Sequence, residues 1–262
     1  MLEVTILSIL QGVAEFLPIS SSGHLVIGQH FLNVKDPGMR LDVFLHFGTL
    51  IAIFIYYRAT IVRLFGAMFT PGATREARRA AWFYALKIFV SALPAVVVYF
   101  TFSKQIDALF ENAKMVGALL MFTGAVLIGT RYLPRGSKDV SLLRSLLMGI
   151  GQAVALLPGV SRSGMTLAAA RGGFVDSEKA AEFSFLMSAP LIAGASLLSL
   201  IKSFGETEAV GVGWGLTLYG TAVSAVVGYF SLALLVKTLK GRRFWWFGIY
   251  CLAAGLFTLI LV

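Results

Sequence analysis

The chain has 262 residues, of which 58% are hydrophobic and only 13% are charged, and its mean hydropathy is +0.83. A soluble domain of this length cannot bury so much apolar surface, so the composition excludes an ordinary water-soluble protein. The net charge of +9 would also suit nucleic-acid binding, but the basic residues lie in short loops between apolar runs rather than on one soluble face. We therefore expect an all-α integral membrane protein that does not bind nucleic acid.

The first apolar segment, residues 1–32, is interrupted near its middle by Pro18 and by the polar run 20–24. It has no basic start and carries Glu3, so we expect it to be part of the mature protein rather than a signal peptide. Each arm beside the break has about 10 to 13 residues, which is about 15–20 Å of helix and half the thickness of a bilayer. The segment is predicted to fold back as a re-entrant helical hairpin.

Six further apolar stretches are long enough to cross a hydrocarbon core about 30 Å thick. They lie near residues 41–57, 81–102, 115–133, 180–202, 212–236 and 244–262. Between the third and the fourth lies a second interrupted segment, residues 141–171, which is broken at 158–164. The predicted fold is a single membrane domain over residues 1–262, with six transmembrane helices and two re-entrant helical hairpins.

Basic residues are concentrated in alternate loops between these stretches. Three loops are rich in basic residues: the first holds Arg58, Arg63, Arg75, Arg78 and Arg79, the second Arg131, Arg135, Lys138 and Arg144, and the third Lys237, Lys240, Arg242 and Arg243. The loops between them have few basic residues, namely Lys35 and Arg40, then Lys104 and Lys114, and then Lys202. Because positive loops stay on the cytoplasmic side, both termini are predicted to lie on the external side.

The two interrupted segments match each other at a constant offset of 141 residues. Gln11, Val13, Ala14, Ser20, Ser22 and Gly23 align with Gln152, Val154, Ala155, Ser161, Ser163 and Gly164. Each copy is followed by three spans, and an odd number of spans inverts the second copy. We predict an inverted-topology repeat with halves of about 1–135 and 141–262, whose broken tips meet near the membrane midplane.

The tips carry residues that suit a phosphate group. Gln11 and Glu15 lie on one helix face, and serines and His24 follow them, while Arg162 lies in the opposite tip. A charged side chain at that depth costs several kcal/mol without an anionic partner. Guanidinium, hydroxyl and helix N-terminal amide groups all bind phosphate. The alternatives are a purely structural ion pair between Arg162 and Glu15, and a buried His24 that is satisfied by its surroundings.

Three other residues have simpler interpretations. Asp42 and His46 lie one turn apart at the start of the first span, where second-shell or metal-ligand roles are conceivable. We favour a structural role for this pair because no third ligand is identifiable. Cys251 is the only cysteine, so no intrachain disulfide is possible, and it is expected to be a small apolar filler.

Two motifs resemble the signatures of a known family. Residues 11–24 (QGVAEFLPISSSGH) and 158–166 (PGVSRSGMT) are similar to the signatures of the bacterial undecaprenyl pyrophosphate phosphatases of the BacA type. Residues 41–49 and 181–190 extend the resemblance, and the span pattern fits over nearly the whole length. The resemblance implies hydrolysis of undecaprenyl diphosphate to phosphate and the monophosphate carrier of cell-wall synthesis. It also implies a bacterial inner membrane location and bacitracin resistance on overexpression.

Carried over by position, the resemblance gives a set of site residues. The expected catalytic residues are Glu15, Ser21, His24 and Arg162. The expected substrate-binding residues are Gln11, Ser20, Ser22, Gly23, Ser161, Ser163, Gly164 and Thr166. Many relatives have a second glutamate where this chain has Gln11, which argues against a mechanism that needs two carboxylates at this place.

Several mechanistic choices stay open on the sequence alone. Ser21 is the expected nucleophile with Glu15 or His24 as its base, and His24 as direct nucleophile is the alternative. A divalent cation, Mg²⁺ or Ca²⁺, is expected to bridge the diphosphate and Glu15. The expected partners are a polyprenyl diphosphate lipid and a second copy of the chain in a homodimer. The rival interpretations are a carrier or flippase that binds the head group without cleaving it, and a purely structural membrane protein.

Overall fold

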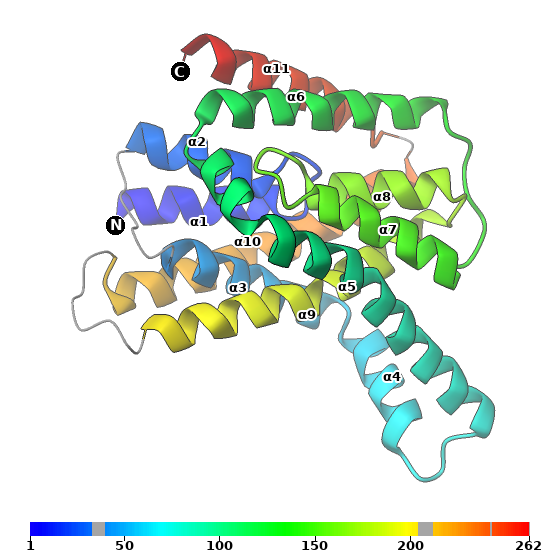
Figure 1. Ribbon diagram of the computed structural model, residues 1–262. Helices are drawn as coiled ribbons and strands as arrows, with labels where there is room; N and C mark the ends of the chain where they lie inside the picture. Colours follow the sequence, from blue (N-terminus) through cyan, green and yellow to red (C-terminus); the bar gives the residue numbers. More distant parts are fainter. Residues whose placement is uncertain (33–39, 204–211, 242, 262) are drawn as a thin grey trace.

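The computed structural model describes residues 1–32, 40–203, 212–241 and 243–261, and in these residues the regular structure is helical (Figure 1). The elements are α1 (Leu2–Ala14), α2 (Ser21–Leu32), α3 (Arg40–Tyr56), α4 (Arg58–Phe69), α5 (Arg75–Phe110), α6 (Ala113–Gly129), the 3-10 turn η1 (Thr130–Tyr132), α7 (Leu142–Val154), α8 (Arg162–Gly172), α9 (Ser177–Ser203), α10 (Trp214–Lys240) and α11 (Trp246–Leu261). Lys35 and Arg242, which the charge argument uses, lie outside the described residues.

The six predicted stretches coincide with α3, α5, α6, α9, α10 and α11. Among the described residues, α5, α6 with η1, and α10 are each long and apolar enough to cross a membrane. Helices α3 and α4 pass the same test together and are bent by 72° at Tyr57. The all-α membrane class is therefore confirmed, whereas six separate spans stay a prediction.

Helix α5 extends well beyond the predicted stretch. Its 36 residues correspond to about 54 Å of helix, more than a hydrocarbon core requires. The N-cap Thr74 accepts a hydrogen bond from the amide of Ala77 at 3.2 Å, and Glu76 in the first turn complements the helix dipole. Local capping thus starts the helix before its apolar part begins, and α4 and the start of α5 project together from the bundle (Figure 1).

Both interrupted segments form pairs of short helices, as the sequence predicts. Helices α1 and α2 have 13 and 12 residues, and α7 and α8 have 13 and 11. Ser20 and Gly159, with φ of 69° and 92°, adopt the left-handed region at the two breaks, and this conformation cannot continue a helix. The short arms are observed, and their re-entrant placement in the bilayer stays a prediction.

The bundle brings each short-helix pair against a long helix from the other part of the chain. Helix α1 packs on α10 and α7 packs on α5, while α3 packs on α10 and on α9. Helices α6 and α11 lie side by side (Figure 1). Their backbones approach at Gly124 and Gly248, where an added Cβ on either residue would lie within 2.7 Å of the other's carbonyl oxygen. Small residues at such contacts are typical of membrane helix packing.

A methyl group at Gly149 is expected to destabilise the protein. A Cβ there would lie 2.3 Å from the carbonyl oxygen of Ser91 on α5, and backbone atoms cannot move aside cheaply. We expect Gly149→Ala to lower the free energy of unfolding by about 1–3 kcal/mol, as overpacking does. The control is Gly215→Ala, because no atom lies within 4 Å of a Cβ built there. Equal thermal melting of the two variants in detergent would contradict this packing.

Candidate active site

The centre of the candidate site is the carboxylate of Glu15, which follows α1 and is only 7% exposed. Gln11, one turn earlier, donates a hydrogen bond from Nε2 to Oε2 of Glu15 at 3.1 Å. Ser21, the first residue of α2, donates from Oγ to the same oxygen at 2.6 Å. The break between α1 and α2 therefore folds a hydroxyl onto a buried acid.

Two further elements reach this carboxylate. Arg162, the first residue of α8, donates from a terminal guanidinium nitrogen to Oε1 of Glu15 in a short contact. Its guanidinium also lies 5.6 Å from the ring centroid of Phe185 on α9. His46 on α3 places Nε2 3.4 Å from Oε2 of Glu15. The structure thus brings the acid, the hydroxyl and the guanidinium of the two tips together, as predicted from the sequence.

Both tips use the same capping chemistry. At the first tip the amide of Gly23 donates to Oγ of Ser20 at 3.3 Å, and the hydroxyls of Ser20 and Ser22 lie 3.4 Å apart. At the second tip the corresponding distances, from Gly164 to Ser161 and from Ser161 to Ser163, are 3.1 and 3.2 Å. A serine side chain in this position satisfies an orphan amide of a helix N-terminus. These serines and glycines therefore shape the tips on which Ser21 and Arg162 are mounted.

The second tip is also held by residues that sequence reasoning missed. Thr123 on α6 donates from Oγ1 to the carbonyl of Gly159 at 2.9 Å and accepts from the amide of Ser161 at 3.1 Å. Thr166, predicted to bind substrate, is fully buried, and its hydroxyl lies 2.6 Å from that of Ser184 on α9. In this structure Thr166 joins α8 to α9, one turn below Arg162.

His24 lies outside the cluster around Glu15. Its Nδ1 is 2.9 Å from the carbonyl oxygen of Ser20, so Nδ1 must be the donor. In the neutral ring Nε2 then accepts a hydrogen bond from the hydroxyl of Tyr250 at 2.7 Å, and the two rings stack with centroids 5.6 Å apart. Both ring nitrogens therefore have partners, as the alternative of a satisfied buried histidine expects, and the catalytic role of His24 stays a prediction. The contact with Tyr250 was not anticipated.

The imidazole that does approach Glu15 belongs to His46. Its Nδ1 is 2.8 Å from the carbonyl oxygen of Asp42, which makes Nδ1 the donor and leaves Nε2 facing Glu15. Asp42 in turn accepts a hydrogen bond from Gln29 at 2.7 Å. A structural role is what the sequence favours for His46. Its position in an apolar span could have indicated a functional role instead, since ionisable residues in such spans are functional by default.

Some polar atoms of the site remain available to a ligand. In the described part of the chain, the second terminal nitrogen of Arg162 and Oε1 of Gln11 are buried and have no hydrogen-bond partner. A buried guanidinium N–H without an acceptor is costly, and an anionic oxygen would satisfy it. Helices α2 and α8 both begin at this cluster, and helix N-termini favour anions. The arrangement therefore suits a phosphate group.

A metal ion has few protein ligands here. The described residues contain no group of three or more His, Cys, Asp or Glu side chains that could hold one. Glu15 is the one carboxylate among the described residues of the cluster and is already paired with Arg162, so that His46 and neutral oxygens such as Oε1 of Gln11 are what remains for a cation. These residues do not by themselves fit a divalent cation.

The fold and the site define a helical membrane protein with a buried acid, hydroxyl and guanidinium at its centre. Residues 4–257 match the family described as bacitracin resistance protein BacA, and the chain belongs to this family. It is 38% identical to the undecaprenyl-diphosphatase of Desulforapulum autotrophicum, over 97% of this chain and 96% of the relative. The enzymes of the same name from Desulfosudis oleivorans and Pelotomaculum thermopropionicum are 38% and 36% identical, over 98% and 99% of this chain and 97% and 96% of the relatives.

The buried pair of Glu15 and Arg162 is expected to behave as a unit. Either Glu15→Gln or Arg162→Gln leaves one buried charge uncompensated, which costs about 3–5 kcal/mol of stability. The double variant removes both charges, so we expect its loss in thermal unfolding to be clearly smaller than the sum of the single losses. Lys240→Gln, which breaks the exposed 2.8 Å pair with Glu178, is the control and should have no measurable effect. Additive losses would contradict the pairing.

Proposed function

We propose that the protein is an undecaprenyl-diphosphatase, a hydrolase that converts undecaprenyl diphosphate into undecaprenyl phosphate and phosphate. The relatives with this printed name match the chain over nearly its whole length at 36–38% identity. The single structural observation that carries the proposal is the 2.6 Å hydrogen bond from the hydroxyl of Ser21 to Glu15 beside Arg162. The reaction recycles the lipid carrier for peptidoglycan synthesis and, as the family name states, confers resistance to bacitracin.

Substrate binding rests on charge neutralisation, which dominates phosphoryl transfer. The free guanidinium nitrogen of Arg162 is available to the terminal phosphate, and the N-termini of α2 and α8 add favourable dipoles. Gln11 has an amide where a second glutamate would add negative charge, so it favours an anionic ligand. The polyprenyl tail would stay between helices in the lipid.

Chemistry would start at Ser21. Its oxygen forms a bond to the terminal phosphorus, the bond from that phosphorus to the bridging oxygen breaks, and undecaprenyl phosphate leaves. The hydroxyl proton passes to Oε2 of Glu15, to which Ser21 already donates. Glu15 then passes this proton to the departing bridging oxygen of undecaprenyl phosphate. In the second half, water attacks the phosphorus of the phosphoserine, Glu15 accepts the water proton and returns it to Oγ of Ser21, and phosphate is released.

The two histidines take different roles in this scheme. Because Nδ1 of His46 donates to the carbonyl of Asp42, Nε2 donates to Glu15 only when the ring carries both protons, and in that form His46 would orient the carboxylate. Both ring nitrogens of His24 are engaged, with Ser20 and with Tyr250, which favours Ser21 over His24 as the nucleophile. We therefore propose that His24 positions the first tip against α11.

The membrane arrangement is part of the proposal. We propose six spans, two re-entrant hairpins and an inverted repeat in a single domain, with both termini external and the chain in the bacterial inner membrane. The matching caps of the two tips support the repeat, as does the packing of α1 on α10 and of α7 on α5. Both described ends of the chain lie at the same end of the bundle (Figure 1), which agrees with termini on one side. The homodimer stays a prediction.

A divalent cation, Mg²⁺ or Ca²⁺, also stays a proposal, and Glu15 is its only predicted protein ligand. Because the protein residues do not form a cage, such a cation would take most of its ligands from the diphosphate and from water. Measuring phosphate release with and without a chelator tests this. We expect the chelator to abolish activity and added Mg²⁺ or Ca²⁺ to restore it.

Ser21→Ala and Arg162→Ala are each expected to lower turnover by at least about 10³-fold, because they remove the attacking oxygen and the main positive charge. Phosphate release from undecaprenyl diphosphate by purified protein in detergent measures this. The matched control is Ser231→Ala, whose hydroxyl bonds only the carbonyl of Val227 in its own helix at 2.9 Å. A folded wild-type protein that binds the lipid diphosphate without releasing phosphate would overturn the hydrolase and favour a carrier.

The histidines can be separated by the same assay. His46→Gln keeps a polar side chain but loses the imidazole beside Glu15, so we expect turnover to fall about 10–100-fold with a small change in KM. His24→Gln is expected to lower thermal stability together with turnover, because it breaks the contacts with Ser20 and Tyr250. Tyr250→Phe should then reproduce the loss of stability. An unaffected His46→Gln enzyme would remove His46 from the site.

A further inference from the structure

A second basic site lies at the end of the bundle opposite the chain termini (Figure 1). Here α6, α8 and α10 end and α11 begins. A cavity of about 460 Å³ is lined by the arginines Arg131, Arg135 and Arg171, by the rings of Tyr132 and Trp245, and by residues 133–134. Arg171 follows Arg162 by nine residues on α8, which is about 14 Å along the helix. The cavity is therefore separate from the candidate active site.

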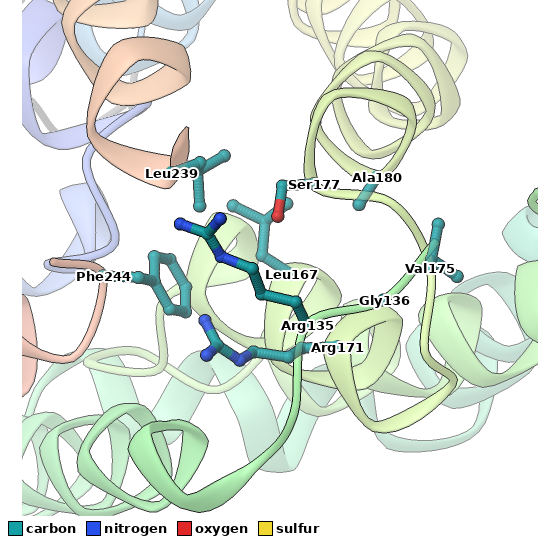
Figure 2. A pocket seen from close by; sticks show the side chains of 9 residues that line it. All are labelled: Arg135, Gly136, Leu167, Arg171, Val175, Ser177, Ala180, Leu239 and Phe244. Atoms are coloured by element: carbon teal, nitrogen blue, oxygen red, sulfur yellow. The ribbon is translucent and has the colours of Figure 1, made fainter. Parts of the chain in front are cut away.

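We call this cavity the mouth. A second, smaller cavity shares Arg135 and Arg171 with the mouth and is also lined by Leu167, Ser177, Leu239 and Phe244 (Figure 2). It holds only about 20 Å³, which is room for about one water molecule. A ligand's polar group therefore has room in the mouth and not in the smaller cavity.

Each of the three arginines has a contact that orients its guanidinium group. Arg131 stacks on Trp245, with 4.6 Å from its guanidinium carbon to the ring centroid. Arg135 donates to the carbonyl of Lys240 at 2.8 Å, and Arg171 donates to the carbonyl of Leu133 at 3.1 Å. A guanidinium has five N–H donors, so one such contact on Arg131 or Arg135 orients the group without using all of its donors. The planar guanidinium can then present two adjacent N–H groups to two oxygens of a tetrahedral phosphate.

The neighbouring acids are engaged elsewhere. Asp139 pairs with Lys179, and Glu178 pairs with Lys240 at 2.8 Å. Asp176 accepts hydrogen bonds from two backbone amides at the start of α9. Within the ranges that the structure describes, no carboxylate lies within 4 Å of the guanidinium nitrogens of Arg131 or Arg135. Among the described residues, the charges of Arg131 and Arg135 are therefore not balanced by ion pairs within the protein.

The surroundings indicate that the mouth lies at the level of lipid head groups. Tyr132 is 80% exposed and Trp246, beside Trp245, is 58% exposed. Exposed aromatic residues at helix ends are typical of the membrane–water interface. Basic pockets between helix ends at this level bind the head groups of anionic lipids.

We propose that this cavity binds the phosphate group of an anionic phospholipid, with Arg131 and Arg135 as the main contacts. The lipid phosphate sits in the mouth, and its acyl chains lie in the bilayer beside the exposed rings of Tyr132 and Trp246. A free phosphate ion shares the head-group chemistry but gains nothing from the adjacent bilayer, so the lipid is the favoured source.

Native mass spectrometry of the detergent-solubilised protein, with equal amounts of phosphatidylglycerol and phosphatidylcholine, tests the proposal. The wild type should retain phosphatidylglycerol preferentially, and the double variant Arg131→Gln with Arg135→Gln should lose this preference by about tenfold. The matched control removes two exposed arginines of α5, with Arg75→Gln and Arg79→Gln, and should keep it. Arg162→Ala should also keep it, because that residue belongs to the other site.

Three outcomes would overturn the proposal: equal retention of both lipids by the wild type, an equal loss in the α5 control, or displacement of the lipid by millimolar inorganic phosphate. Hydrolysis of undecaprenyl diphosphate by the double glutamine variant reports that it is folded. If that variant does not fold, the double variant Arg131→Lys with Arg135→Lys keeps both positive charges but removes the planar guanidinium groups. Its preference for phosphatidylglycerol should still fall several-fold, and undiminished retention of phosphatidylglycerol would overturn the assignment.

Discussion

Glu15 and Arg162 are charged groups in a place where neither is stable alone. Removing a carboxylate and a guanidinium from water costs several kcal/mol for each, and only a close partner with good geometry offsets this cost. The two residues lie on different broken tips, 147 positions apart in the chain, and meet in a direct contact. The rest of the bundle can be understood as the support that this meeting requires. Thr123 holds the second tip to α6, and Tyr250 holds the first tip to α11 through His24.

The two tips share the same capping hydrogen bond and differ in the side chains that they present. At the offset of 141 residues, Ser21 corresponds to Arg162, and both side chains donate to Glu15, one to each carboxylate oxygen. Leu156 stands where Glu15 would recur, and the amide of Gln152 is buried with no hydrogen-bond partner among the described residues. The same capping hydrogen bond therefore presents the hydroxyl of Ser21 at the first tip and the guanidinium of Arg162 at the second. The acid, Glu15, occurs only at the first tip. This division of roles explains how two copies of a structural motif can form one site rather than two.

The same physics links the centre of the protein to its basic end. Arginine is used at both places because its planar fork matches phosphate oxygens, but the surroundings differ. At the centre Arg162 faces a buried acid, and a ligand has to share or displace that contact. At the end of the bundle Arg131 and Arg135 are held by a ring and a carbonyl, and their surroundings are partly open. The arrangement at the centre suits a substrate that is bound and released in each catalytic cycle. The arrangement at the end of the bundle suits a lipid that remains bound.

The sequence by itself determined the membrane class, the positions of the apolar stretches and the two interrupted segments. These features are local, because run length decides whether a helix can cross and Pro18, Ser20 and Gly159 break helices where they stand. The sequence also predicted that the two tips combine in one site, with Arg162 facing an anionic ligand, while the choice of Ser21 came from the family resemblance. Only the tertiary structure decided which imidazole joins them. His46 reaches Glu15 and His24 turns to Tyr250 because the rotation and depth of α3 and α11 within the bundle place them so, and no local pattern encodes that.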